Sequence, residues 1–199
     1  MGETILNILK FLMAIALMPI VIACTLGGYE HLAEYPVHIA PFFKWGLIAF
    51  FLTYVFIYQF TGVFAVGQQL MSGLFRFLAP LDQFIAYCIP FYTSLILLVY
   101  VILDKMFDAT QYSHYFLFFA GFAFAMHVLL VAQDLQQNGA NKATYFFTMS
   151  LVYIINICVI VFYLDWVSRE WTILPFIQDA AGRAIDIYLM VFERMIATT

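Results

Sequence analysis

Charge is scarce in this sequence of 199 residues, because Asp, Glu, Lys and Arg together make up 10% of it, against about 25% in an ordinary soluble domain. Apolar residues make up 65%, and the mean hydropathy is +0.96. A soluble domain of this size has too little interior to bury so many apolar side chains. The composition therefore excludes a soluble domain, a disordered tail and a disulfide-rich secreted scaffold.

Basic residues, cysteines and catalytic motifs are equally sparse. The 8 Lys and Arg residues stand against 12 Asp and Glu, for a net charge of −4, and they form no basic stripe, which excludes a nucleic-acid partner. The three cysteines, Cys24, Cys88 and Cys158, form no C-x-x-C pair and are interpreted as small buried apolar residues. The chain has no H-E-x-x-H, no G-x-S-x-G, no P-loop and no Rossmann glycine pattern, so we expect no enzyme.

Five windows without any charged residue divide the chain, and each is 17 to 21 residues long. A helix rises about 1.5 Å per residue, so each window would be roughly 26–32 Å long, close to the ~30 Å hydrocarbon core of a bilayer. Backbone polar groups in lipid must bond within their own segment, which makes these windows helices. We therefore predict an all-α, polytopic membrane bundle, a single membrane domain over residues 1–199, with spans at about 11–27, 46–66, 84–103, 115–133 and 145–164.

The prolines and the connecting segments refine this prediction. Pro19 and Pro90 fall inside the first and third windows, where each is expected to bend the helix. Segment 28–44 is polar and is interpreted as a loop. Segment 67–83 is half apolar, and we expect a short interfacial helix at about 68–79.

The last 25 or so residues combine charge with apolar faces. The charged residues recur at helical spacing along one stripe. Three charges within eight residues give a span that faces lipid on all sides a large free-energy cost of insertion. We predict an amphipathic helix at about 173–197, lying on the membrane or packed against the bundle; the alternative is a sixth span whose stripe faces a partner or a pore. The charged residues of the stripe are Asp179, Arg183, Asp186 and Glu193.

Residues 1–28 have the length of a signal peptide, and residues 21–24 (VIAC) fit the pattern around a bacterial lipoprotein cysteine. Signal peptides begin with basic residues, whereas here a single Lys10 is balanced by Glu3. We therefore expect the N-terminus to be retained. Counting Lys and Arg on the two faces gives three against five, which predicts an external N-terminus and a cytoplasmic C-terminal tail, in a bacterial inner membrane or its equivalent.

Polar residues inside the spans are the candidate functional residues, because polar groups at membrane depth are by default functional candidates. Measured from one face, several of them fall in one layer about 8–14 Å deep, with one nearer the midplane. One interpretation is hydrogen bonding that holds the helices together; the other is a proton or solute site centred on a histidine. The layer comprises Gln59, His127, Ser150, Tyr153 and Asn156.

Metal and cofactor binding receive little support. His31, Glu34 and His38 are spaced as ligands on one helical face, but Pro36 interrupts that turn and favours a solvated loop. Aromatic residues make up 20% of the chain. Their side chains are suited to contacts with other subunits, with flat ligands or with lipid. The spans lack the facing histidine pairs that two haems in a helical bundle require. The sequence assigns no metal and no cofactor.

Three functions remain open. The first is a non-catalytic subunit of a larger membrane complex for transport, secretion or energy conversion, with the bilayer and other membrane subunits as partners. The second is a small homo-oligomeric transporter or channel, with the polar layer around His127 or the tail stripe along its path. The third is a redox subunit that holds quinone or haem.

Gly121 and Ala125 also form a small-xxx-small pair, which indicates close helix approach.

Overall fold

The computed structural model describes residues 2–35, 40–57, 60–137 and 141–197, and within these ranges the chain is helical without strands. The all-α class is therefore confirmed for the described part of the chain. Two short 3-10 helices, η1 (Arg76–Leu78) and η2 (Ala109–Tyr112), stand between longer elements. The α-helices are α1 (Gly2–Glu34), α2 (Ala40–Ile57), α3 (Thr61–Leu74), α4 (Asp82–Cys88), α5 (Phe91–Phe107), α6 (Ser113–Gln137), α7 (Lys142–Ser168) and α8 (Ile173–Ala197).

Three stretches of helix are long and apolar enough to cross a membrane: α1, η2 together with α6, and α7. They contain the expected spans 11–27, 115–133 and 145–164. The expected span 84–103 corresponds to α4 and α5, which make a fourth candidate if the pair is taken as one span bent by 62°. The bend lies where Pro90 was expected to produce it, because proline has no N–H and its ring clashes with the preceding turn.

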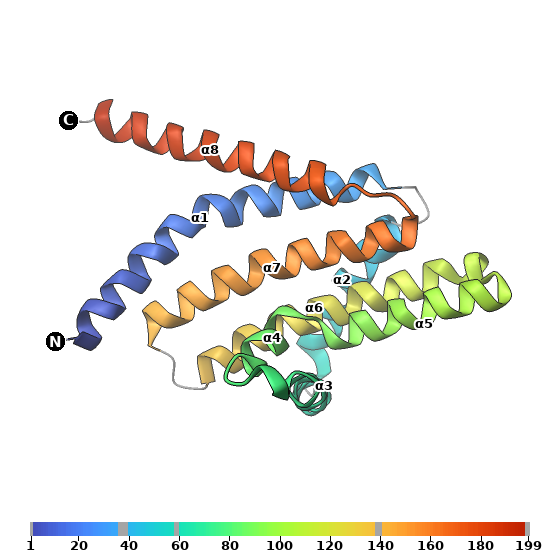
Figure 1. Ribbon diagram of the computed structural model, residues 1–199. Helices are drawn as coiled ribbons and strands as arrows, with labels where there is room; N and C mark the ends of the chain where they lie inside the picture. The colour runs from blue at the N-terminus through green and yellow to red at the C-terminus, as the bar shows by residue number, and fades with distance from the viewer. Residues whose placement is uncertain (1, 36–39, 58–59, 138–140, 198–199) are drawn as a thin grey trace.

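The expectation of one helix over 46–66 is wrong, because α2 ends at Ile57 and a separate helix, α3, begins at Thr61. In Figure 1, α3 is seen nearly end-on, so it lies across the direction of the long helices. It buries Phe64, Gly67 and Met71 at i, i+3 and i+7. The interfacial helix expected at 68–79 thus begins earlier and ends at Leu74. A window without charge shows that the residues tolerate lipid, but not that the helix is continuous.

The boundaries of the other elements follow local chemistry. The N-cap of α7 is Asn141, whose side chain accepts a 2.8 Å hydrogen bond from the Thr144 backbone N–H, and capping of this kind satisfies an orphan donor. The first helix continues through Pro19 to Glu34. The interpretation of segment 28–44 as a loop is therefore wrong at both ends, because α1 runs to Glu34 and α2 begins at Ala40. Contacts of α1 with α7 and α8 stabilise the last turns of α1.

Helices α2 and α6 pack at two glycines. A side chain on Gly46 of α2 would overlap the carbonyl oxygen of Phe118, and one on Gly121 of α6 would overlap that of Phe43. The close approach that the Gly121 and Ala125 pair indicated is therefore present, with α2 as the neighbour. Glycine allows such contact because it has no Cβ.

The last helix returns along the first. Helix α8 packs against α1 (Figure 1) and buries Phe176, Ala180 and Ala184 at intervals of four residues. Its bounds confirm the predicted helix at 173–197. The two ends of the described chain, Gly2 and Ala197, lie at the same end of the bundle (Figure 1).

Candidate functional site

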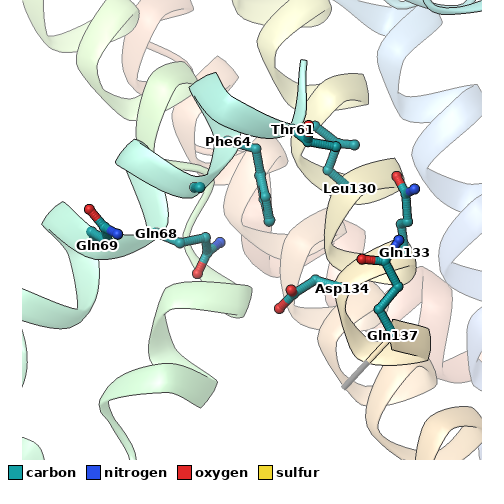
Figure 2. A pocket seen from close by; sticks show the side chains of 9 residues that line it. Thr61, Phe64, Gln68, Gln69, Leu130, Gln133, Asp134 and Gln137 are labelled. Carbon is teal, nitrogen blue, oxygen red and sulfur yellow. The ribbon is translucent and has the colours of Figure 1, made fainter. Parts of the chain in front are cut away.

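A polar cleft lies between α3 and α6, at the same end of the bundle as the two termini (Figures 1 and 2). Its volume is about 340 Å³. On the α6 side, Leu130, Gln133, Asp134 and Gln137 follow one another at i, i+3, i+4 and i+7, which places them on one helical face. The α3 side supplies Thr61, Phe64, Ala65, Gln68 and Gln69.

A second cavity of about 280 Å³ extends the cleft toward α4. Gln68, Gln69 and Asp134 line both cavities, so the two form one polar depression. The second cavity adds Ser72 of α3, and the residues from α4 are Asp82, Gln83, Ala86 and Tyr87. In a chain with so few charged residues, this concentration of amide and carboxylate side chains is the main polar feature of the bundle end.

Hydrogen bonds fix the walls of the cleft. The Tyr87 hydroxyl donates to Asp134 Oδ2 at 2.6 Å and accepts from Gln83 Nε2 at 2.8 Å. Gln68 Nε2 donates to the carbonyl oxygen of Ala86 at 3.0 Å. The three helices that form the cleft are thus tied together by side chains that also line it.

The break between α4 and α5 explains why two of these partners exist. In a continuous helix, the carbonyl oxygens of Ala86 and Tyr87 would accept from residues 90 and 91. Pro90 has no N–H, and α5 begins only at Phe91, so both carbonyls are freed. Buried backbone oxygens need a partner, and Gln68 supplies one for Ala86.

The Tyr87 carbonyl receives two donors, one from α6 and one from α7. His127 Nε2 lies 2.9 Å from this oxygen and Asn156 Nδ2 lies 3.0 Å from it. Because a carbonyl only accepts, His127 Nε2 carries a proton. Both side chains are buried. This arrangement closes the inner end of the polar region with packed, hydrogen-bonded side chains.

The predicted polar layer is thus brought together only in part. His127 and Asn156 meet at the Tyr87 carbonyl, and Asn156 Oδ1 is buried with no partner among the described residues. Ser150 is buried. Tyr153 faces α1, where its hydroxyl lies 3.1 Å from Thr25 Oγ1. Gln59 lies outside the described residues.

The charged stripe of the tail divides in two. Arg183 forms ion pairs with Glu30 of α1 and with Asp179 one turn earlier on α8, the latter at 2.7 Å. The Arg183 guanidinium donates to both carboxylates, with Nη1 at 3.1 Å from Glu30 Oε1. Asp186 and Glu193 are exposed. The first half of the stripe therefore binds α1, which the sequence did not show.

The weak metal candidates are also separated. His31 is buried in α1, where its Nε2 lies 2.7 Å from Thr172 Oγ1 and its Nδ1 lies 3.4 Å from Glu34. His38 lies outside the described residues. Among the residues that the structure describes, no group of three His, Cys, Asp or Glu side chains is placed to hold a metal ion.

Sequence reasoning missed a buried carboxylate at the opposite end of the bundle. Asp165 directly follows the expected span 145–164, and it is fully buried. It accepts from the Tyr35 hydroxyl at 2.5 Å, from the backbone N–H groups of Thr172 and Ile173 at 2.7 Å each, and from Thr172 Oγ1. Asp165 thereby caps the start of α8 and ties it to α1 and α7.

The cleft was missed as well, although its signal was present. Asp134 directly follows the expected span 115–133, and Gln68 is the first residue of the expected interfacial helix. The spacing of Gln133, Asp134 and Gln137 on one helical face was the available clue. That this face meets α3 and α4 follows only from the tertiary structure.

Comparison with known proteins adds no relative: no family model, no curated protein and no solved structure matches this chain. The fold and the cleft therefore define its class, a helical protein with apolar helices compatible with several membrane crossings.

Proposed function

We propose that this chain is a small membrane transporter whose polar cleft binds a water-soluble solute at one face of the bilayer. The observation that carries the proposal is the position of the cleft beside a broken helix. In membrane transporters, substrate sites are typically built where a transmembrane helix is discontinuous and backbone groups are freed. Here the α4–α5 break frees two carbonyls, and the cleft is lined by the side chain that binds one of them, Gln68.

This function implies a topology with six crossings, made by α1, α2, α4 with α5, α6, α7 and α8. Helix α2 has 18 residues, which rise about 27 Å. It is therefore long enough to cross the hydrocarbon core of a thin bilayer. Helix α3 then lies along the face on which the cleft opens. Helix α8 returns beside α1 as the sixth crossing, so both termini reach that face.

The cleft is closed on its inner side by His127 and Asn156, which occupy the Tyr87 carbonyl. Transport then requires a second arrangement in which this closure opens toward the other face. The break at Pro90 supplies a hinge for that change, because a helix that is already interrupted changes its angle without losing further backbone hydrogen bonds.

The experiment is uptake of labelled solutes into proteoliposomes that contain the full-length chain. The probes are ethylene glycol, urea, ethanolamine and glycolate, which differ in charge but are all small and polar. We expect at least one of them to enter faster than into protein-free vesicles, and this excess to disappear in Gln68→Leu. Gln136→Leu is the matched control, because Gln136 is exposed on α6 and does not line the cleft. Uptake at the protein-free rate for all four probes would contradict the proposal.

A second candidate function is an integral subunit of a larger membrane assembly. It is favoured by α1, because only 6% of its most apolar stretch is buried, and by Phe56 near the end of α2, which is 83% exposed. Such surface is covered by lipid or by a neighbouring subunit. Native mass spectrometry of particles extracted gently from the membrane separates the two. Other polypeptides at fixed stoichiometry would support the subunit, whereas a lone chain or a homo-oligomer would contradict it.

A further inference from the structure

We infer that the solute bound by the cleft carries a primary ammonium group. This inference rests on the proposed solute-binding function and narrows the chemical class of the ligand. It follows from the charge of the lining, from the direction of its hydrogen bonds and from the aromatic ring between its walls.

The lining carries negative charge only. Asp134 lines both parts of the cleft and Asp82 lines the part next to α4. Neither part is lined by a Lys, Arg or His residue among the described residues. At the end of an apolar bundle the local dielectric is lower than in water, so carboxylates repel anions and attract cations strongly. The charge therefore excludes an anionic ligand.

The hydrogen bonds leave acceptors facing the cleft. Gln68 and Gln83 each use the amide nitrogen to donate within the protein, to the Ala86 carbonyl and to the Tyr87 hydroxyl. The amide oxygens of both residues remain as acceptors. A ligand in the cleft therefore meets oxygen acceptors, rather than N–H donors, on these two side chains.

An ammonium group matches this pattern, because it carries three donors, no acceptor and a positive charge. The cleft also contains an aromatic ring. Figure 2 shows Phe64 projecting from α3 into the space between Gln68 and Asp134, and the ring is nearly buried. Cations bind over aromatic faces. An acidic oxygen and a ring on opposite sides of one space form a setting suited to an amine.

The size of the cleft favours an organic cation over a bare ion. A volume of about 340 Å³ lies within the range typical of small-molecule sites. A divalent metal ion needs several oxygen ligands at about 2.0–2.6 Å. The lining offers two carboxylates, and no set of three metal-binding side chains occurs among the described residues.

The experiment measures thermal unfolding of the purified full-length protein at neutral pH in the presence of three matched probes. Ethanolammonium chloride, ethylene glycol and sodium glycolate share one hydroxyl end and differ in the charge of the other. Ionic strength is held constant with sodium chloride. A ligand that binds only the folded state raises the unfolding temperature in a saturable way. We expect saturable stabilisation by ethanolammonium and none by ethylene glycol or glycolate.

Variants assign the effect to the cleft. Asp134→Asn keeps an oxygen that accepts from the Tyr87 hydroxyl but removes the charge, and we expect it to weaken ethanolammonium binding at least tenfold. Asp186→Asn, on the exposed face of α8, is the matched control and should bind as the wild type does. If Asp134→Asn fails to fold, Asp82→Asn gives a second test, because it removes the other carboxylate of the lining.

Each other result overturns the inference. Equal stabilisation by ethylene glycol would show that the cleft does not select for the positive charge of the ligand. Equal stabilisation by sodium or potassium chloride alone would indicate an inorganic cation site. No saturable effect from ethanolammonium would also overturn it. The proposed transport function is decided separately by the uptake experiment, because neutral solutes entering through the cleft would uphold it even when ethanolammonium does not bind.

Discussion

The hydroxyl of Tyr87 donates a 2.6 Å hydrogen bond to Asp134, and this contact joins the broken helix to the wall of the cleft. Tyr87 belongs to α4, at the break, whereas Asp134 belongs to α6. The carbonyl of the same tyrosine accepts from His127 and Asn156. A single residue therefore connects the polar cleft with the closure beneath it.

Removing this hydroxyl should destabilise the protein. In Tyr87→Phe, Asp134 loses a charge-assisted hydrogen bond and Gln83 loses its acceptor. Bonds of this type contribute about 1.5–3 kcal/mol, and water in the open cleft replaces part of that, so we expect a loss of about 1–2 kcal/mol. The measurement is the free energy of unfolding in detergent. Tyr115→Phe, at an exposed position, is the control, and an equal effect in both variants would contradict the assigned role.

The two donors to the Tyr87 carbonyl should be coupled. Each of His127→Leu and Asn156→Leu alone leaves this oxygen with one donor, and interhelical bonds in membranes contribute about 0.6 kcal/mol on average. The double variant removes both of these donors from a buried carbonyl, which costs about 1–3 kcal/mol. We expect the double variant to lose more stability than the sum of the single variants, as a double-mutant cycle measures. Strict additivity would show that the two side chains do not share this oxygen.

The Asp165 cluster should hold the start of α8. In Asp165→Asn, an amide NH₂ group takes the place of a carboxylate oxygen that accepts from backbone N–H groups. Loss of a buried acceptor with charge costs about 2–4 kcal/mol, and we expect α8 to detach locally before the bundle unfolds. Hydrogen–deuterium exchange over residues 173–184 measures this. Faster exchange in Asp165→Asn but not in Asp186→Asn is the expected result; unchanged protection would be inconsistent with a capping role.

The glycine contact between α2 and α6 should tolerate no side chain. Gly121→Ala would place a methyl group on the Phe43 backbone, and overpacking of this kind costs about 1–3 kcal/mol. Gly182→Ala, where nothing lies within 4 Å of the added Cβ, should instead stabilise α8 by about 0.5–1 kcal/mol, because glycine is unfavourable inside helices. Unfolding free energies of the two variants therefore should move in opposite directions. A stable Gly121→Ala would mean that the helices are farther apart than the structure places them.

Much of the fold followed from local sequence. Runs without charge located α1, α6 and α7, because helical hydrogen bonds are formed within a segment and apolar side chains need only lipid or other apolar groups around them. Pro90 located the break between α4 and α5, because its chemistry acts on the preceding turn. The prediction of one helix over 46–66 was wrong. The apolar composition shows that these residues can lie in lipid, but it does not determine whether the helix continues in one direction.

Much less of the site followed from the sequence. His127 and Asn156 were both recognised as polar groups inside the spans. Pro90 marks the break that frees the Tyr87 carbonyl, but nothing in the sequence shows which side chains reach that oxygen. Tyr153 lies at a similar depth, yet faces α1. Depth along a helix was therefore readable, whereas the direction of each side chain around the bundle axis was not.

The sequence by itself determined that this is an all-helical chain built for an apolar environment, where its long helices lie, and where one of them breaks. The tertiary structure alone decided that Gln68, Asp134 and Tyr87, from three different helices, meet in one cleft, and that Asp165 is buried as a cap rather than exposed at an interface. The reason is physical. Helix formation depends on neighbours within four residues, whereas a cleft depends on contacts between residues that are far apart in the chain and on the angle at which helices meet.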